Sequence, residues 1–250
     1  MKKILTSLLF LATLATPSFA WDLLKMNETI EKTNVIVSGI CSGTIVNLEY
    51  KLVLTAHHCI TDNLREEIVK EVDPDTGVIT EKKVQKKIPM YIETWKHQDF
   101  EVVSTERHVA NVVDFDYSKD IALLQVVDDA WEGEGAAAIA AEIDAGYVYL
   151  RGKKIFAVGN PGVEFDGSVT EGIISAPQRM IDLGRGKVPF FQFSAGVIGG
   201  NSGGAIYSDD GKIVGTVSAG VRGSPVSFGV PAKYSQELID RFIARKKLLP

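Results

Sequence analysis

Two short patterns in the sequence place residues capable of nucleophilic catalysis beside small residues that expose them. Residues 54–59 read Leu-Thr-Ala-His-His-Cys, and residues 199–204 read Gly-Gly-Asn-Ser-Gly-Gly. Glycines beside a nucleophile let the backbone approach a substrate closely, and two inward-facing N–H groups can stabilise the oxyanion of an acyl transfer. Taken alone, the glycine-rich serine pattern is also compatible with a simple tight turn.

The order of the candidate residues along the chain separates the possible arrangements of serine, histidine and acid. Residues 200–204 also fit the G-x-S-x-G nucleophile elbow of α/β-hydrolases, but that fold places its histidine after the serine. All four histidines, at positions 57, 58, 97 and 108, precede Ser202, and the only aspartate before His57 and His58 is Asp22. The order histidine, acid, serine therefore remains, which is the order of the two-barrel serine proteases.

The acid of such an arrangement must lie between the histidines and the serine. Asp114, Asp116 and Asp120 cluster in this interval, and Asp120 directly precedes the apolar run 121–124. A carboxylate at a strand entrance is shielded from water and can accept the Nδ1–H of an imidazole. We expect Asp120 to be that acid, and we expect the other two to be ordinary loop acids. We also expect His57 to pack locally, and the remaining histidines, His97 and His108, to lie at the surface.

The elements that must position these residues are short strands. Apolar, β-branched runs of four to seven residues recur between Gly, Asn, Asp and Pro, a spacing typical of strands. They occupy residues 34–38, 43–46, 52–55, 121–127, 154–158, 169–174, 190–194, 204–207, 213–218 and 227–230. Residues 209–211 (Asp-Asp-Gly) predict a hairpin turn. Helical spacing is clearest at residues 234–247, so the sequence predicts an all-β protein with a C-terminal helix.

The strands fall into two groups, which predict two lobes. We expect an N-terminal lobe at about 33–130, a linker at about 131–146 and a C-terminal lobe at about 147–232, followed by the helix at about 234–247. The interval between the groups is rich in Ala, Glu and Gly, as a linker would be. The highly charged residues 69–87 predict a polar hairpin projecting from the first lobe.

Composition and the N-terminal residues bound the class of protein. The 250 residues suit one large domain or two small ones, and 45% hydrophobic with 24% charged residues argues against intrinsic disorder. The formal charge of −5 offers no basic face for nucleic acid. Residues 1–20 combine two lysines, an apolar run at 4–15 and Ser-Phe-Ala at 18–20, which predicts an export signal cleaved after Ala20. The apolar run is shorter than the ~20 residues of a spanning helix.

Export predicts a periplasmic or secreted product with no stable membrane anchor after cleavage, and it decides how Cys41 and Cys59 are interpreted. In an oxidising compartment, an even pair of cysteines most simply forms one disulfide. A zinc site built from these cysteines with His57 and His58 is the alternative, but it lacks the C-x-x-C or H-E-x-x-H spacing. We therefore expect no metal and no cofactor.

Residues 55–59, 120–124 and 200–204 together resemble the three signature blocks of trypsin-like (chymotrypsin-fold) serine proteases, in the family's order. Residues 41–44 (Cys-Ser-Gly-Thr) are similar to the family's strand whose cysteine bonds to the cysteine beside the catalytic histidine, which implies a Cys41–Cys59 disulfide. The resemblance extends from Cys41 to about Pro231. It implies a chymotrypsin-like fold of two six-stranded antiparallel β-barrel lobes with the C-terminal helix.

The resemblance also implies a role for each matching residue. In the family the histidine immediately precedes the cysteine, so His58 is implied as the base, and His57 takes a position usually filled by a small residue. Asp120 would orient His58, and Ser202 would attack a peptide carbonyl to form an acyl-enzyme. The N–H groups of Gly200 and Ser202 would bind the oxyanion.

The substrate-binding residues follow from alignment with the same family. The base of the S1 pocket falls at Gly196 and Val197, and the pocket wall falls at Ser218, Ala219 and Gly220. None of these residues is an acid that could hold Lys or Arg, and no histidine stands at position 217 to hold a glutamate. The sequence therefore predicts a small or medium apolar P1 residue.

Within the family, residues 158–162, 169–176 and 228–231 resemble segments of the bacterial HtrA/DegP-like branch, and the chain also looks similar to the glutamyl-endopeptidase branch. Two departures from the HtrA type are visible. We expect no PDZ domain after the helix, and the block before Ser202 lacks the usual Asn-Pro-Gly-Asn approach. Asn201 stands where trypsin-like zymogens carry an aspartate, and no I-V-G-G start precedes Cys41, so we predict activity without activation cleavage.

These observations predict an exported serine endopeptidase that hydrolyses protein or peptide substrates. Two alternatives stay open at this point. A catalytically inactive relative could serve as a binding module, with residues 69–87 as its contact surface, and an esterase could use the same triad on the same scaffold. The sequence leaves the oligomeric state open.

Overall fold

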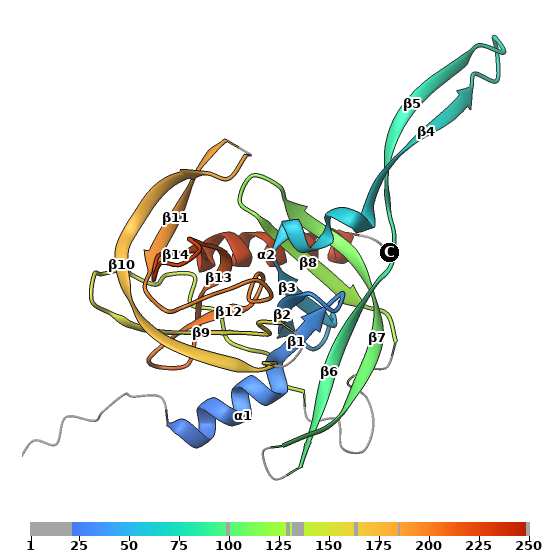
Figure 1. The fold of residues 1–250 in the computed structure, drawn as a ribbon. Helices are drawn as coiled ribbons and strands as arrows, with labels where there is room; N and C mark the ends of the chain where they lie inside the picture. The colour runs from blue at the N-terminus through green and yellow to red at the C-terminus, as the bar shows by residue number, and fades with distance from the viewer. Residues whose placement is uncertain are drawn as a thin grey trace, which may run out of the picture.

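Strands from the two halves of the chain close into two separate antiparallel barrels, which lie side by side in Figure 1. The computed structural model describes residues 22–98, 101–128, 131, 138–162, 165–184 and 186–248. The predicted export signal at residues 1–20 and part of the predicted linker at 131–146 lie outside the described residues. The prediction of two six-stranded barrels with a C-terminal helix is confirmed.

The N-terminal barrel joins its strands in the order β1-β2-β3-β8-β7-β6 and closes where β1 pairs with β6. Aliphatic side chains such as Val35, Val53, Ile92 and Leu124 are fully buried inside it. Its strands are β1 (Asn34–Val37), β2 (Cys41–Asn47), β3 (Leu52–Thr55), β6 (Met90–Gln98), β7 (Glu101–Asp116) and β8 (Ile121–Val126).

The C-terminal barrel has the strand order β10-β11-β14-β13-β12-β9 and closes where β9 pairs with β10. Ile155, Ile174, Phe191 and Phe193 form part of its core. Its strands are β9 (Lys154–Gly159), β10 (Ser168–Asp182), β11 (Lys187–Phe193), β12 (Ala205–Ser208), β13 (Ile213–Gly220) and β14 (Ser227–Pro231).

Helix α2 (Ala232–Leu248) runs behind both barrels in the view of Figure 1 and joins them through a shared core. Leu238 and Phe242 lie one turn apart on its buried face, as the predicted helical spacing requires. They pack in one cluster with Leu52 of the first barrel and Phe190 of the second. Helix α2 thus packs against both lobes from behind.

Helix α1 (Leu23–Thr33) precedes the first strand and is capped by Asp22, whose carboxylate accepts the N–H of Leu24 at 2.8 Å. It docks onto the second barrel through a buried hydrogen bond, 3.0 Å long, between the hydroxyls of Thr33 and Tyr207. Burial raises the pKa of Tyr207 to about 12. Among the helices of the described ranges, none is both long and apolar enough to cross a bilayer.

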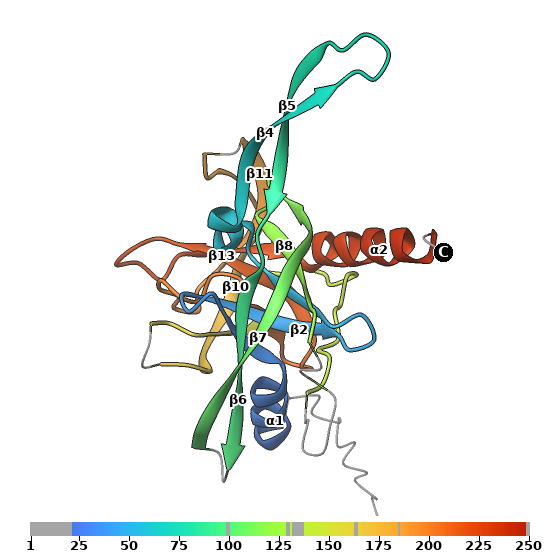
Figure 2. The ribbon, with the colours of Figure 1, turned by 90° about the vertical axis from the view of Figure 1, so that its right-hand side faces the viewer.

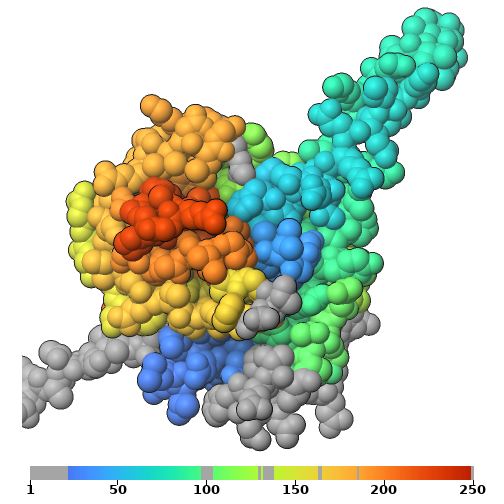
Figure 3. Space-filling view, viewed as in Figure 1, coloured from blue at the N-terminus to red at the C-terminus, as the bar shows by residue number. Residues whose placement is uncertain are grey.

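A two-stranded ribbon, β4 (Leu64–Val72) and β5 (Ile79–Lys87), extends away from the body of the molecule (Figures 1 and 2). Its strands pair in register from end to end, and Lys86 bridges across them to Glu67 at 2.9 Å. Figure 3 shows the ribbon as a narrow arm reaching into solvent. The predicted polar hairpin at 69–87 is confirmed, although the ribbon begins at Leu64.

Candidate active site

The two adjacent histidines leave the first barrel together and point to different surroundings. Strand β3 ends at Thr55, and the 3-10 helix η1 (His57–Asn63) follows the buried Ala56. The His57 ring is buried, with ring centroids 5.0 Å from Phe115 and 5.2 Å from Tyr117. The His58 side chain is 34% exposed. His57 therefore packs locally, as expected, whereas His58 faces a solvent-accessible site.

Asp120 is buried at the turn between β7 and β8 and accepts hydrogen bonds from two segments. Its carboxylate lies 2.9 and 3.0 Å from Nδ1 of His58, and it also accepts the backbone N–H of His58 at 3.0 Å. The hydroxyl of Ser218 donates to its second oxygen at 2.5 Å. Because both oxygens accept from neighbours, the carboxylate is fixed in orientation, and the imidazole with it.

The backbone of Asp120 adopts φ +58°, in the left-handed region. Asp and Asn reach this region more readily than most residues, because their short polar side chains bond locally. The turn thus favours an acid or its amide at this position. A carboxylate held 1% exposed beside an imidazole is the arrangement that keeps Nδ1 protonated and Nε2 available to accept a proton.

The expectation for Asp114 is wrong, and so is the expectation for His108. Asp114 is not an ordinary loop acid: it lies buried at the end of β7 and binds Arg241 twice at 2.8 Å and Arg245 at 2.7 Å, both from α2. Burial acts to raise the pKa of Asp114, but the hydrogen bonds and charges of the arginines outweigh it, so the pKa is lowered. Asp116, by contrast, binds the nearby Lys119 at 2.6 Å.

His108 was expected at the surface, yet it is 8% exposed and lies in the wall of the first barrel. Its ring bonds the hydroxyl of Thr94 at 3.1 Å and pairs with Asp128 at 3.2 Å. His108 belongs to β7, where it pairs with Ile92 of β6. Neither strand was predicted, so this position could not be recognised as part of the barrel wall. His97 lies in β6, but its side chain is outside the described residues.

Ser202 lies in the loop that joins β11 to β12 of the second barrel, and its backbone carbonyl is held by the first barrel. Its carbonyl accepts the N–H of Ser42 at 2.8 Å and lies 3.7 Å from the sulfur of Cys59, next in sequence to His58. The next residue, Gly203, has φ +84°, and a Cβ there would stand 2.3 Å from both Ser42 O and Thr55 Oγ1. Glycine is therefore required for Ser202 to approach the end of β3, where the histidines begin.

In the loop around Ser202, backbone N–H groups that donate a hydrogen bond to a described residue alternate with N–H groups that do not. Asn201 donates to Ile198 at 3.1 Å and Gly203 donates to Val217 at 2.8 Å. Within the ranges that the structure describes, the N–H groups of Gly200 and Ser202 donate to no other residue. Gly200 has φ +103°, a conformation that side chains rarely adopt. Both residues are half-buried, so two adjacent donors remain available to a ligand beside the serine.

The five predicted S1 residues lie on two segments that meet. Gly196 and Val197 follow β11, and the carbonyl of Gly196 accepts the hydroxyl of Thr170 at 2.9 Å. A Cβ at Gly220 of β13 would stand 3.0 Å from the side chain of Val197. The structure therefore brings Val197 against the strand that carries Ser218, Ala219 and Gly220.

Sequence reasoning missed two hydroxyl groups of this region. Ser218 was assigned only to the pocket wall, but its buried side chain turns to Asp120. Ser42 was noted only as part of a cysteine-containing strand, but its hydroxyl lies between Gly200 and Asn160. No local pattern signals either contact, because the bonded residues are 98 to 158 positions apart.

Cys41 and Cys59 are joined in a disulfide, as predicted. Together with His58, their side chains lie within 4.8 Å of one another, which could suggest a metal site. Zinc is held by cysteine in its thiolate form, and both sulfurs are committed to the disulfide. The disulfide instead ties the start of β2 to η1.

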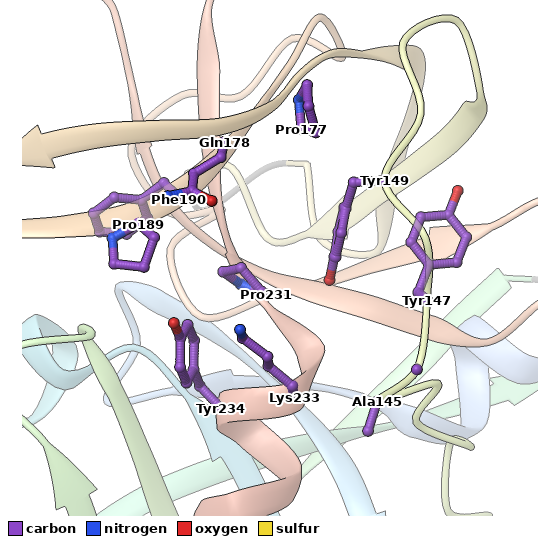
Figure 4. A pocket seen from close by; sticks show the side chains of 11 residues that line it. Ala145, Tyr147, Tyr149, Pro177, Gln178, Pro189, Phe190, Pro231, Lys233 and Tyr234 are labelled. Carbon is purple, nitrogen blue, oxygen red and sulfur yellow. The ribbon is translucent and has the colours of Figure 1, made fainter.

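A cavity of about 380 Å³ lies at the start of α2, away from these residues (Figure 4). Tyr149 forms part of its wall, and its hydroxyl accepts the N–H of Ala232 at 3.1 Å and donates to Val214 at 2.5 Å. Burial raises the pKa of Tyr149. None of the predicted site residues lines this cavity, and its tyrosine anchors the first turn of α2.

Comparisons with known proteins identify the family of the chain. The family model described as trypsin-like peptidase domain matches residues 41–215. Over 151 residues the chain is 30% identical to the "Serine protease Do-like HtrB" of Bacillus subtilis (strain 168), covering 57% of this chain and 32% of that protein. Over 108 residues it is 37% identical to the "Serine protease HtrA-like" of Staphylococcus aureus (strain MRSA252), covering 39% of this chain and 14% of that protein. The chain therefore spans less than half the length of these curated relatives. From the family match and the two-barrel fold together, the chain belongs to the trypsin-like peptidase family.

Proposed function

We propose that the protein is a serine endopeptidase in which His58, Asp120 and Ser202 form the catalytic triad. The observation that carries the proposal is the network around Asp120. Its carboxylate bonds Nδ1 and the backbone of His58 at 2.9 to 3.0 Å, and the same barrel also holds the carbonyl of Ser202 through the N–H of Ser42. An imidazole oriented through Nδ1 leaves Nε2 to act as a base.

The proposed reaction is a double displacement. His58 removes the hydroxyl proton of Ser202 as the oxygen attacks the peptide carbonyl, and Asp120 stabilises the imidazolium that forms. The N–H groups of Gly200 and Ser202, which have no other acceptor within the described ranges, bind the oxyanion. His58 then protonates the leaving amine. Water repeats the sequence on the acyl-enzyme and releases the acid product.

We propose that the S1 pocket accepts small or medium apolar side chains. Gly196, Val197, Ser218, Ala219 and Gly220 carry no charge, so the pocket offers no partner for Lys, Arg or Glu. The side chain of Val197 lies so close to Gly220 that a Cβ at Gly220 would be only 3.0 Å from it. This close approach narrows the space between the base and the wall of the S1 pocket. A profile over a peptide library with a strong Arg, Lys or Glu preference at P1 would contradict this assignment.

We also propose export with cleavage after Ala20 and activity without further processing. The Cys41–Cys59 disulfide supports export, because disulfides persist in oxidising compartments. Val35 is buried in β1 and paired with Gly43, so a cut there would disrupt the first barrel. Protein beginning at Trp21 should be active as purified. If activity appears only after a cut near Val35, this part of the proposal is wrong.

Hydrolysis of an internally quenched peptide library by the mature chain tests the proposed activity. We expect turnover that Ser202→Ala and His58→Ala each abolish, while His57→Phe, at the packed neighbour, retains it. Peptide and ester substrates of the same P1 residue are compared in parallel. Turnover of esters alone would establish the esterase alternative, and a folded wild-type protein without turnover of either would favour the binding-module alternative.

A further inference from the structure

We infer that Ser42 is a positioning residue for the oxyanion site, which rests on the function proposed above. Ser42 is the second residue of β2, is completely buried and bonds four partners. Its hydroxyl donates to the carbonyl of Gly200 at 2.7 Å and accepts the N–H of Asn160 at 2.7 Å. Its backbone N–H donates to the carbonyl of Ser202 at 2.8 Å, and its carbonyl accepts the hydroxyl of Thr55 at 2.7 Å.

These bonds hold alternate peptide units of the serine loop. The unit that contains the carbonyl of Gly200 also contains the N–H of Asn201, and both ends are bonded, to Ser42 and to Ile198. The unit that contains the carbonyl of Ser202 also contains the N–H of Gly203, and both ends are bonded as well. Because a peptide unit is planar, each of these two units is fixed in orientation.

The two N–H groups without an acceptor among the described residues belong to the peptide unit between these two fixed units and to the unit before them. The N–H of Ser202 belongs to the unit enclosed by the two fixed ones, and the N–H of Gly200 belongs to the unit that directly precedes them. Gly200 at φ +103° has no side chain to resist rotation of its neighbouring units. The unit that carries the Ser202 N–H is also held at its carbonyl end, because Asn201 accepts the N–H of Gly204 at 3.0 Å. Fixing the carbonyl of Gly200 on Ser42 therefore limits rotation of the units on either side of it, which carry the two donors.

The contacts of Asn160 extend this support to the junction of the barrels. Asn160 donates its N–H to the Ser42 hydroxyl, and its side-chain amide donates to the carbonyl of Val35 at 2.9 Å and accepts from Asn34 at 2.9 Å. A Cβ at Gly200 would stand 2.2 Å from the carbonyl of Asn160, so the loop packs directly on this segment. The Ser42 hydroxyl therefore joins the loop that carries Gly200 and Ser202 to the hydrogen-bonded segment around Asn160.

Removing the hydroxyl by Ser42→Ala leaves the carbonyl of Gly200 and the N–H of Asn160 without their partner. We expect kcat to fall about 10- to 100-fold, less than the roughly 10²- to 10³-fold loss caused by deleting one oxyanion donor. KM should change less than threefold, because the oxyanion forms only in the transition state. The inhibition constant of a peptide aldehyde, whose adduct carries the oxyanion, should rise by the same factor as kcat falls, while binding of the product peptide stays unchanged.

The matched control is Ser235→Ala, which removes the hydroxyl of another completely buried serine, on α2 and bonded to Thr216 at 3.5 Å. It should leave kcat and the aldehyde constant within twofold of the wild type. Rates are expressed per active site titrated with a fluorophosphonate, so that partial misfolding does not count as lost catalysis. Ser42→Gly provides a second variant, which keeps the backbone bonds of Ser42 and should reproduce the loss in kcat.

The outcomes separate this inference from the proposed function. A folded wild-type protein that neither hydrolyses peptides nor reacts with the fluorophosphonate overturns the function itself. A wild-type enzyme that is active, with Ser42 variants that retain kcat and aldehyde binding within twofold, overturns the positioning role alone. Equal losses in kcat and in product-peptide binding would also overturn it, since they indicate general damage to the substrate site.

Discussion

Replacing Asp120 by asparagine should nearly abolish catalysis while leaving the fold intact. Asn has the same shape and tolerates the φ of +58° at this turn. Oδ1 of Asp120 accepts both the backbone N–H and the Nδ1–H of His58, whereas Oδ2 lies near Nδ1 and the Ser218 hydroxyl. The backbone donor keeps the amide oxygen at Oδ1, so the new NH₂ group occupies the Oδ2 position.

The size of the expected loss in kcat follows from the tautomer of His58 that Asp120→Asn imposes. The Ser218 hydroxyl can rotate to accept from the NH₂ group, but Nδ1 of His58 now faces a donor at the position that stood 2.9 Å away. Nδ1 then favours its unprotonated form, and the proton moves to Nε2, where it blocks removal of the serine proton. We expect kcat to fall about 10⁴-fold, which corresponds to about 5.5 kcal/mol of transition-state stabilisation. The unfolding midpoint should stay within about 3 °C, since the volume and the backbone geometry are kept.

Peptide hydrolysis and the rate of fluorophosphonate labelling measure this effect, and thermal unfolding monitors the fold. Asp116→Asn is the matched control, because Asp116 lies nearby but binds Ser118 and Lys119 rather than the histidine. It should change kcat less than twofold. A folded Asp120→Asn variant that labels within tenfold of the wild-type rate would refute the assignment of Asp120 as the orienting acid.

Three further predictions concern the scaffold around the site. Replacing Cys41 and Cys59 together by serine should lower the free energy of unfolding by about 3 kcal/mol, because their disulfide closes a separation of 18 residues; an unchanged urea midpoint would contradict this. Despite burial, the arginines of α2 lower the pKa of Asp114 from 3.8, so its carboxylate stabilises the fold above pH 3.8, and this stability is lost as the pH falls through the lower folded value. Asp114→Asn should therefore lose less stability than the wild type between pH 5 and pH 2 in urea unfolding, and an identical pH slope would exclude this role. Gly203→Ala should destabilise the fold by about 3 kcal/mol or more, whereas Gly223→Ala, also at positive φ but in open space, should cost less in the same assay; equal losses would show that the clash does not matter.

Strands that are buried along their whole length could be predicted from the sequence, because such strands form continuous apolar runs. Strands β3 and β8 are of this kind, and their predicted ranges, 52–55 and 121–127, agree closely with the structure. Strands β6 and β7 were not predicted. Strand β7 carries Arg, His, Asn and Asp among its apolar residues, and part of its length pairs with β6 outside the closed core of the barrel. Their stability comes from pairing across the barrel, which local periodicity does not report.

In the candidate site too, some residues could be recognised from local sequence patterns, and others only from their tertiary contacts. His58, Asp120 and Ser202 could be predicted because each stands in a short block of distinctive residues. The contacts of the Ser42 and Ser218 hydroxyls could not, because each has its partner in the opposite barrel. A serine beside a cysteine or at a strand end is common, so only the fold reveals which carbonyl or carboxylate it meets.

The most direct test of the central claim is the site at which a fluorophosphonate modifies the mature protein, located by mass spectrometry of its peptides. We expect one phosphonyl group on Ser202, formed slowly or not at all in Asp120→Asn and absent in Ser202→Ala. A folded protein that stays unmodified, or that carries the group on another residue, would contradict the claim that His58, Asp120 and Ser202 work as one catalytic unit.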